Sequence, residues 1–194
     1  MEAIEKIKEI VSEAVSDAQI EIVNSTPAAA QPGLLVDREH VYGVAKLLKE
    51  DPRFQMDFCS CVTAVEYPKL GAIEVVYHLY SVALKHGLIV LKVRAPRELE
   101  QCRVPSLTPL WRGCEFQERE AYDLYGVKFD GHPDLRRILM WDEFTDHPMR
   151  KDYVPPADYE WEPTPHDDTL ARARAASGIV PPSAIEEADK AKKK

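Results

Sequence analysis

The chain has 194 residues, of which 45% are hydrophobic and 30% are charged, and its formal net charge is −8. This length is enough for a domain with a buried core, because a domain of about 150 residues buries roughly 70% of the surface of its unfolded chain. The negative charge argues against a nucleic-acid binder, and no apolar run approaches the roughly 20 residues of a membrane-spanning helix, so we expect a cytoplasmic protein that reaches a membrane only through partner chains.

The first part of the chain, residues 1–96, predicts one α+β domain with the order helix, two strands, helix, three strands. The helices follow from apolar positions three and four apart, and the strands from alternation and β-branched residues. The expected ranges are residues 2–17 (helix), 19–23 and 34–36 (strands), 38–49 (helix, with Asp37 as its N-cap), and 54–66, 72–84 and 88–93 (strands). Short connections between the last three strands favour antiparallel pairing, which gives a mixed sheet with helices on one face.

The strand predicted at 54–66 also determines how two cysteines are placed. Phe58, Ser60, Val62 and Ala64 are expected to share one of its faces, and Cys59 and Cys61 the other. We interpret the four cysteines of the chain as buried thiols, since none forms a CxxC pair and their spacing matches no common cluster or zinc pattern. A metal or iron–sulfur site is the alternative. The cysteines concerned are Cys59, Cys61, Cys102 and Cys114.

Residues 97–153 are expected to pack on the same domain. Short helices are predicted at 97–101 and 105–111, and a longer one at 115–125, where early acidic residues suit the helix dipole and Gly126 ends the helix. After Val127 the periodicity ends. Residues 154–194 are rich in proline and predict an extended tail, bound to a partner or disordered.

Charged residues concentrate in the helix at 115–125. Arg119 and Asp123 are four residues apart and are expected to pair, as are Glu118 and the Tyr122 phenol. A solvated helix face that contributes little is the alternative interpretation of this pattern, in which Glu120 also takes part.

Two positively charged stretches follow this helix. Arg136 and Arg137 come after a turn at 131–133 and precede the apolar residues 138–140, which could form an edge strand or dock on another subunit. A second rigid stretch, 147–153, contains the pair Arg150 and Lys151. No glycine-rich loop precedes a helix here, so a backbone cradle for phosphate is missing.

Together these residues resemble the signature of the 30 kDa-type family of respiratory complex I, the type-I NADH:quinone oxidoreductase. The resemblance is close over 111–153 and looser over 54–153. The positions that carry it are Glu118, Arg119, Glu120, Asp123, Leu124, Tyr125, His132, Arg136, Arg137, Ile138, Leu139, Arg150, Lys151, Asp152 and Tyr153.

The resemblance implies a scaffold protein without a catalytic centre, cofactor or metal of its own. Its expected place is the peripheral arm, on the cytoplasmic face of the bacterial inner membrane, beside the quinone-site subunit and neighbouring iron–sulfur subunits. FMN, the iron–sulfur clusters, NADH and quinone would be bound by other subunits. We expect an ion-pair network that fixes the path of the chain after residue 126, formed by Glu118, Arg119, Glu120, Asp123, Arg136 and Arg137.

Other interpretations stay open at this point. The same module occurs in related membrane-bound hydrogenases and in reductases fed by ferredoxin or deazaflavin, so the electron donor and the quinone are not determined. A free-standing redox or metal protein that uses the four cysteines is a further alternative, and a general adaptor is another.

Overall fold

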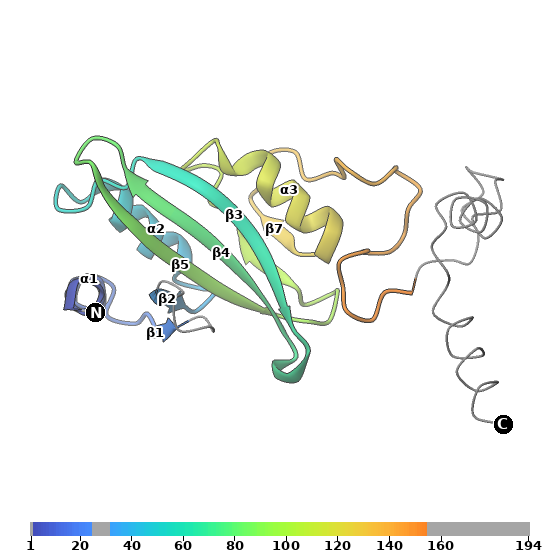
Figure 1. Cartoon of the computed structure of the whole chain (residues 1–194), viewed down its shortest axis with the longest axis horizontal. Helices are drawn as coiled ribbons and strands as arrows, with labels where there is room; N and C mark the ends of the chain where they lie inside the picture. The colour runs from blue at the N-terminus through green and yellow to red at the C-terminus, as the bar shows by residue number, and fades with distance from the viewer. Residues whose placement is uncertain (1, 25–31, 155–194) are drawn as a thin grey trace, which may run out of the picture. The chain divides into compact units, whose positions relative to one another are not determined.

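The computed structural model describes residues 2–24 and 32–154, and its centre is a five-stranded mixed sheet (Figure 1). The predicted tail at 154–194 lies outside the described residues apart from Val154. The elements in chain order are α1 (Glu2–Ala14), β1 (Ile20–Asn24), β2 (Pro32–Val36), α2 (Val41–Glu50), β3 (Phe58–Tyr67), the 3-10 turn η1 (Pro68–Leu70), β4 (Ala72–Ser81), β5 (His86–Pro96), β6 (Arg103–Pro105), α3 (Cys114–Tyr125) and β7 (Lys128–Asp130).

The order of strands across the sheet is β1-β2-β5-β4-β3. The three long strands pair antiparallel through short connections, as predicted, and β1 also pairs antiparallel with β2. The β2–β5 pair is parallel, and it joins the N-terminal hairpin to the three-stranded meander. The predicted α+β class with a mixed sheet is therefore confirmed.

One face of the sheet carries the core, and the helices lie on that face. Alternate residues of the central strands, such as Tyr77 and Leu91, are fully buried, and α1 and α2 add Val11 and Leu48 to the same cluster. Figure 1 shows α2 behind the sheet and α3 alongside β3. Helix α3 also covers the free edge of the sheet, since the Gln117 side chain accepts the N–H of Val62 at 2.6 Å.

A β-bulge in β3 overturns two predictions. The register of β3 against β4 shifts between Cys59 and Cys61, so that one extra residue is accommodated. As a result Cys59 is buried while Cys61 is exposed, and the two do not share a face. Phe58 is likewise half exposed, whereas Val62 and Ala64 face the core. The alternation predicted from Phe58 through Ala64 was wrong because a bulge leaves no mark in the hydrophobic pattern.

Several element boundaries also differ from the predictions. Helix α2 begins at Val41 with His40 at its N-cap position, because residues 38–40 form a turn in which the Asp37 carboxylate accepts the His40 N–H at 3.2 Å. Helix α1 ends at Ala14.

The segments predicted as helices at 97–101 and 105–111 are turns instead. The short strands β6 and β7, which pair in parallel, were missed, since three residues are too few to show a period. No helix in the described part of the chain is long and apolar enough to cross a membrane.

Candidate functional site

The predicted signature residues meet where α3 lies against the segment that follows β7. We call residues 131–153 the strap, because this stretch has no helix or strand and runs along α3 to the end of the sheet. Three groups of contacts hold the strap, and together they are called the clamp.

The first contact of the clamp is the carboxylate of Asp123, which is fully buried. One oxygen accepts from the Arg137 guanidinium at 2.6 Å, and the other accepts three successive backbone N–H groups, those of Ile138, Leu139 and Met140, at 2.7–3.0 Å. Burial alone would raise the pKa of Asp123, but these hydrogen bonds outweigh burial and lower it. Residues 138–140 thus form an anion-binding nest for a carboxylate of the same chain and not the predicted edge strand.

Arg119, one turn earlier on α3, also binds the strap. It is 4% exposed, and its guanidinium donates to the backbone carbonyls of Arg136 and Arg137 at 3.1 and 3.3 Å. The predicted pair between Arg119 and Asp123 was therefore wrong. Each of the two side chains points to the strap, and their opposite charges hold adjacent parts of it.

The second contact is the C-terminal end of α3, where the last carbonyls of a helix lack partners within the helix. The carbonyls of Asp123, Leu124 and Tyr125 accept the His147 ring, the Met149 N–H and the Arg150 guanidinium at 2.9, 3.1 and 2.8 Å. The cation of Arg150 also suits the negative end of the helix dipole.

Gly126 allows the strap to approach this helix end. Its φ of 77° is the left-handed conformation that ends α3, as predicted. A Cβ at this position would lie 2.7 Å from the ring of His147 and 2.6 Å from Leu99. Burial lowers the pKa of His147, and the neighbouring Arg137 and Arg150 add to that effect.

The third contact joins the strap to the end of the sheet through Glu66, on β3. Its carboxylate accepts the Arg97 guanidinium and the Lys151 N–H, both at 2.5 Å. Arg97 bonds in addition to Asp152 at 2.6 Å, and its carbonyl accepts from Arg150 at 2.8 Å. Glu66 and Arg97 were not among the predicted site residues, although a carboxylate at a core-facing strand position was a usable signal.

Glu118 belongs to a different cluster. Its buried carboxylate accepts hydrogen bonds from Tyr77 (3.1 Å), Ser106 (2.6 Å), the Leu107 N–H (2.8 Å) and Thr108 (3.1 Å). Burial raises the pKa of Glu118 in spite of these donors. The predicted pair with Tyr122 was therefore wrong: Glu118 fastens α3 to the sheet and to the loop at 106–108.

The other signature residues occupy supporting positions. His132 accepts the Asp134 N–H at 3.1 Å through Nδ1, so its Nε2 carries the proton and donates to the Glu115 carbonyl at 3.0 Å. Arg136 contributes its carbonyl, while its exposed guanidinium pairs with Asp134. Tyr153 packs against Phe144. Within the proposed six-residue network, the structure joins Arg119, Asp123, Arg137 and the Arg136 backbone, but places Glu118 elsewhere and leaves Glu120 exposed.

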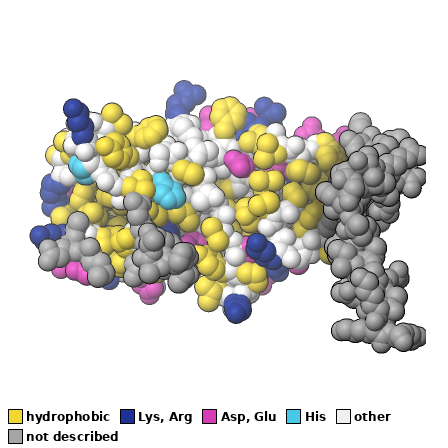
Figure 2. Space-filling model, viewed as in Figure 1, with side chains coloured by type: hydrophobic (Ala, Val, Ile, Leu, Met, Phe, Trp, Pro, Cys, Tyr) yellow, Lys and Arg dark blue, Asp and Glu magenta, His cyan; other side chains and the backbone are white. Residues whose placement is uncertain are grey.

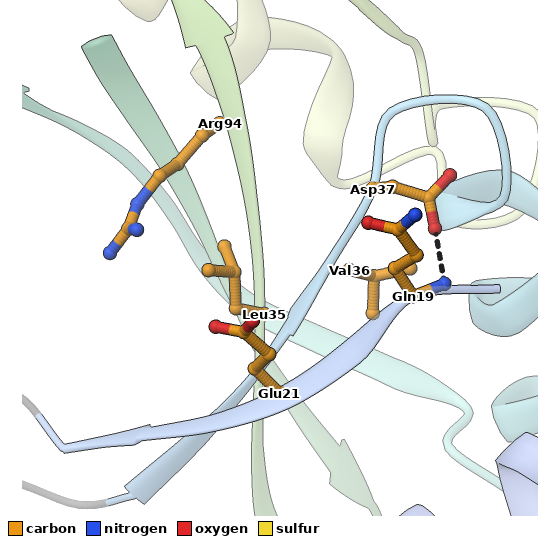
Figure 3. Close-up of a pocket in the computed structure, with 6 residues that line it drawn as sticks. All are labelled: Gln19, Glu21, Leu35, Val36, Asp37 and Arg94. Atoms are coloured by element: carbon orange, nitrogen blue, oxygen red, sulfur yellow. Dashed lines mark hydrogen bonds between the residues drawn. The ribbon is translucent and has the colours of Figure 1, made fainter. Parts of the chain in front are cut away.

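A separate polar pocket of about 280 Å³ lies beside β1 and β2 (Figure 3). Glu21 and Arg94 line it with Asp37, whose carboxylate accepts the Gln19 N–H at 2.8 Å. None of its lining residues belongs to the clamp. The described residues contain no group of three or more His, Cys, Asp or Glu side chains that could hold a metal ion, and the four cysteines are free thiols.

Comparison with known proteins gives consistent matches. The family model described as "Respiratory-chain NADH dehydrogenase, 30 Kd subunit" matches residues 34–159. A subunit of the NADH-quinone oxidoreductase of Moorella thermoacetica is 46% identical over 122 residues, which cover 63% of this chain and 79% of that protein. A relative of the same name from Rhizobium meliloti is 43% identical over 120 residues, 61% of this chain and 63% of that protein.

Two solved structures share the fold. A chain of the archaeal membrane-bound sulfane sulfur reductase has a TM-score of 0.61 at 25% identity and matches 92% of this chain and 93% of its own length. A trypsin-resistant fragment of Nqo5 has a TM-score of 0.51 at 27% identity and matches 68% and 98%.

Proposed function

Because the chain belongs to the family of the 30 kDa subunit of the respiratory-chain NADH dehydrogenase, we propose that it is a scaffold subunit of an NADH:quinone oxidoreductase and has no catalytic centre of its own. The observation that carries this proposal is the use of charge in the clamp. Arg119, Asp123 and Arg150 all bind backbone groups of the same chain. Their role is to fix the path of the strap.

A fixed strap suits a protein that positions its neighbours. The clamp leaves Leu139, Trp141 and Met149 exposed by 60, 39 and 50%, so the strap presents apolar side chains on a backbone held by α3. We place this edge against the quinone-site subunit and the adjacent iron–sulfur subunits. FMN, iron–sulfur clusters, NADH and quinone would bind to those other subunits, and the chain would lie on the cytoplasmic face of the membrane through its partners.

One observation favours a second candidate within the same class. The archaeal membrane-bound sulfane sulfur reductase chain aligns with almost the whole of this chain. A scaffold of this kind is therefore compatible with a complex that has another electron donor or acceptor, as in related hydrogenases or ferredoxin-fed reductases. The chains that co-purify with it from gently solubilised membranes distinguish the two candidates.

The clamp itself supplies the test of the scaffold role. Arg119→Ala removes both hydrogen bonds to the strap, and we expect the isolated chain to stay folded while its amount in the assembled complex falls. Arg136→Ala is the matched control, because only its carbonyl takes part in the clamp and its guanidinium is exposed. Normal assembly and normal quinone reduction in Arg119→Ala membranes would contradict the proposed role.

A further inference from the structure

An apolar cluster lies at the end of the sheet that the clamp does not reach. Phe58 begins β3, and Val82 and Leu84 lie in the connection between β4 and β5; their exposed fractions are 50, 57 and 43%. We call these three side chains the hairpin knob. Strand β5 runs from this connection to Pro96, next to Arg97 of the clamp, over 11 residues. At about 3.3 Å per residue the two sites are therefore on the order of 30 Å apart.

The backbone of the knob is held in place by its own hydrogen bonds. The Asp57 carboxylate accepts the N–H groups of Val82 and Ala83 at 2.7 and 3.0 Å, and the buried Ser81 hydroxyl accepts that of Leu84 at 3.1 Å. Residues at such a turn are usually Gly, Asn, Asp or Ser. Here apolar side chains are presented on a rigid turn, and rigid presentation lowers the entropic cost of binding a partner.

The charges beside the knob are positive, although the chain carries −8 overall. Lys85 is exposed in the same connection, and Arg112 is exposed beside Gly113, which lies against the Cys59 carbonyl at the start of β3. Neither has an ion-pair partner among the residues that the structure describes. The neighbouring carboxylate of Asp57 is occupied by backbone N–H groups. Figure 2 shows hydrophobic and basic side chains together at this end of the molecule.

We infer that the hairpin knob is a second docking surface, and that it binds a protein partner with an apolar groove bordered by carboxylates. The apolar side chains would fill the groove, and Lys85 and Arg112 would face its acidic rim. This inference rests on the proposed function, since it assumes that the chain belongs to a larger assembly. It adds a contact at the opposite end from the clamp, so that the chain would bridge two neighbours and not only border one.

Substitution within the assembled complex tests the inference. The double variant Val82→Asp/Leu84→Asp places charge in the groove and repels its rim, and we expect its retention in the solubilised complex to fall about tenfold, a free-energy change of about 1.4 kcal/mol. Tyr42→Asp, on the exposed side of α2, is the control and should be retained like the wild type. Unchanged thermal unfolding of the isolated variants would show that the fold is intact.

A photo-crosslinker at position 84 then identifies the partner. The expected product joins it to an Asp- or Glu-bearing peptide of one other subunit. Crosslinks only to lipid, to a second copy of the chain or to solvent would overturn the inference, as would normal retention of the double variant. A wild-type chain that is absent from the complex would instead refute the proposed function.

Discussion

The clamp depends most on Asp123, and Asp123→Asn is the substitution that tests it most directly. Asparagine keeps the shape of the side chain but removes its charge, and its NH₂ group must stand where one of two accepting oxygens stood. A donor would then face either Arg137 or the N–H groups of residues 138–140. Breaking one partner of a buried ion pair costs about 3–5 kcal/mol. Because Arg137 remains 11% exposed, we expect the lower end, about 3 kcal/mol.

The measurement is urea unfolding of the full chain, wild type against Asp123→Asn, at several pH values. The pKa of Asp123 is below its usual 3.8 in the folded chain. The unfolded chain therefore takes up the proton first, so the carboxylate contributes its stability above about pH 4, and this contribution is lost as pH falls through the folded pKa. The difference between the two proteins should shrink in that acidic window. A difference below about 1 kcal/mol at neutral pH, or one that does not change on acidification, would refute the account of the clamp.

Three further predictions follow from individual contacts. Gly126→Ala should destabilise the chain by about 1–3 kcal/mol in thermal unfolding, because φ is positive and the methyl group meets His147 and Leu99; Gly43→Ala, in open space on α2, should stabilise it by about 0.5–1 kcal/mol. Glu118→Gln should gain stability relative to the wild type as pH rises above the usual carboxyl pKa of 4.5, because the raised pKa of Glu118 means that ionisation costs the folded chain stability; a pH-independent difference would count against this. Under native conditions a thiol reagent should modify Cys61 first, and Cys59, Cys102 and Cys114 only after unfolding, as mass spectrometry of labelled peptides would show.

The sequence predicted the order of elements well, and it also identified the segment that forms the clamp. Helix α3 and its end at Gly126 could be predicted because capping and periodicity are local properties. The partners of its charged residues could not, since the pairing rule for residues four apart considers only the helix. Arg119 and Asp123 instead bind residues 14 to 18 positions away, in a strap without regular structure.

Two other features could not be predicted for different reasons. The bulge at Cys59–Cys61 reverses the face of each residue before it, and the apolar pattern of β3 is compatible with either phase. Glu66 and Arg97, which hold the end of the strap, are far from the signature segment in sequence. Only the unusual presence of a carboxylate on the buried face of a strand marks Glu66 as a site residue.

The chemistry of the clamp explains why charges hold the strap. Apolar packing tolerates a shift of the chain by one residue, because neighbouring apolar side chains can fill the same space. A buried carboxylate that needs the N–H groups of Ile138, Leu139 and Met140 together with Arg137 accepts only one register, since a slip would leave it unpaired. A buried ion pair of this kind adds little net stability compared with apolar residues. Its contribution is therefore position, and position is what a protein that sets the spacing of its neighbours has to supply.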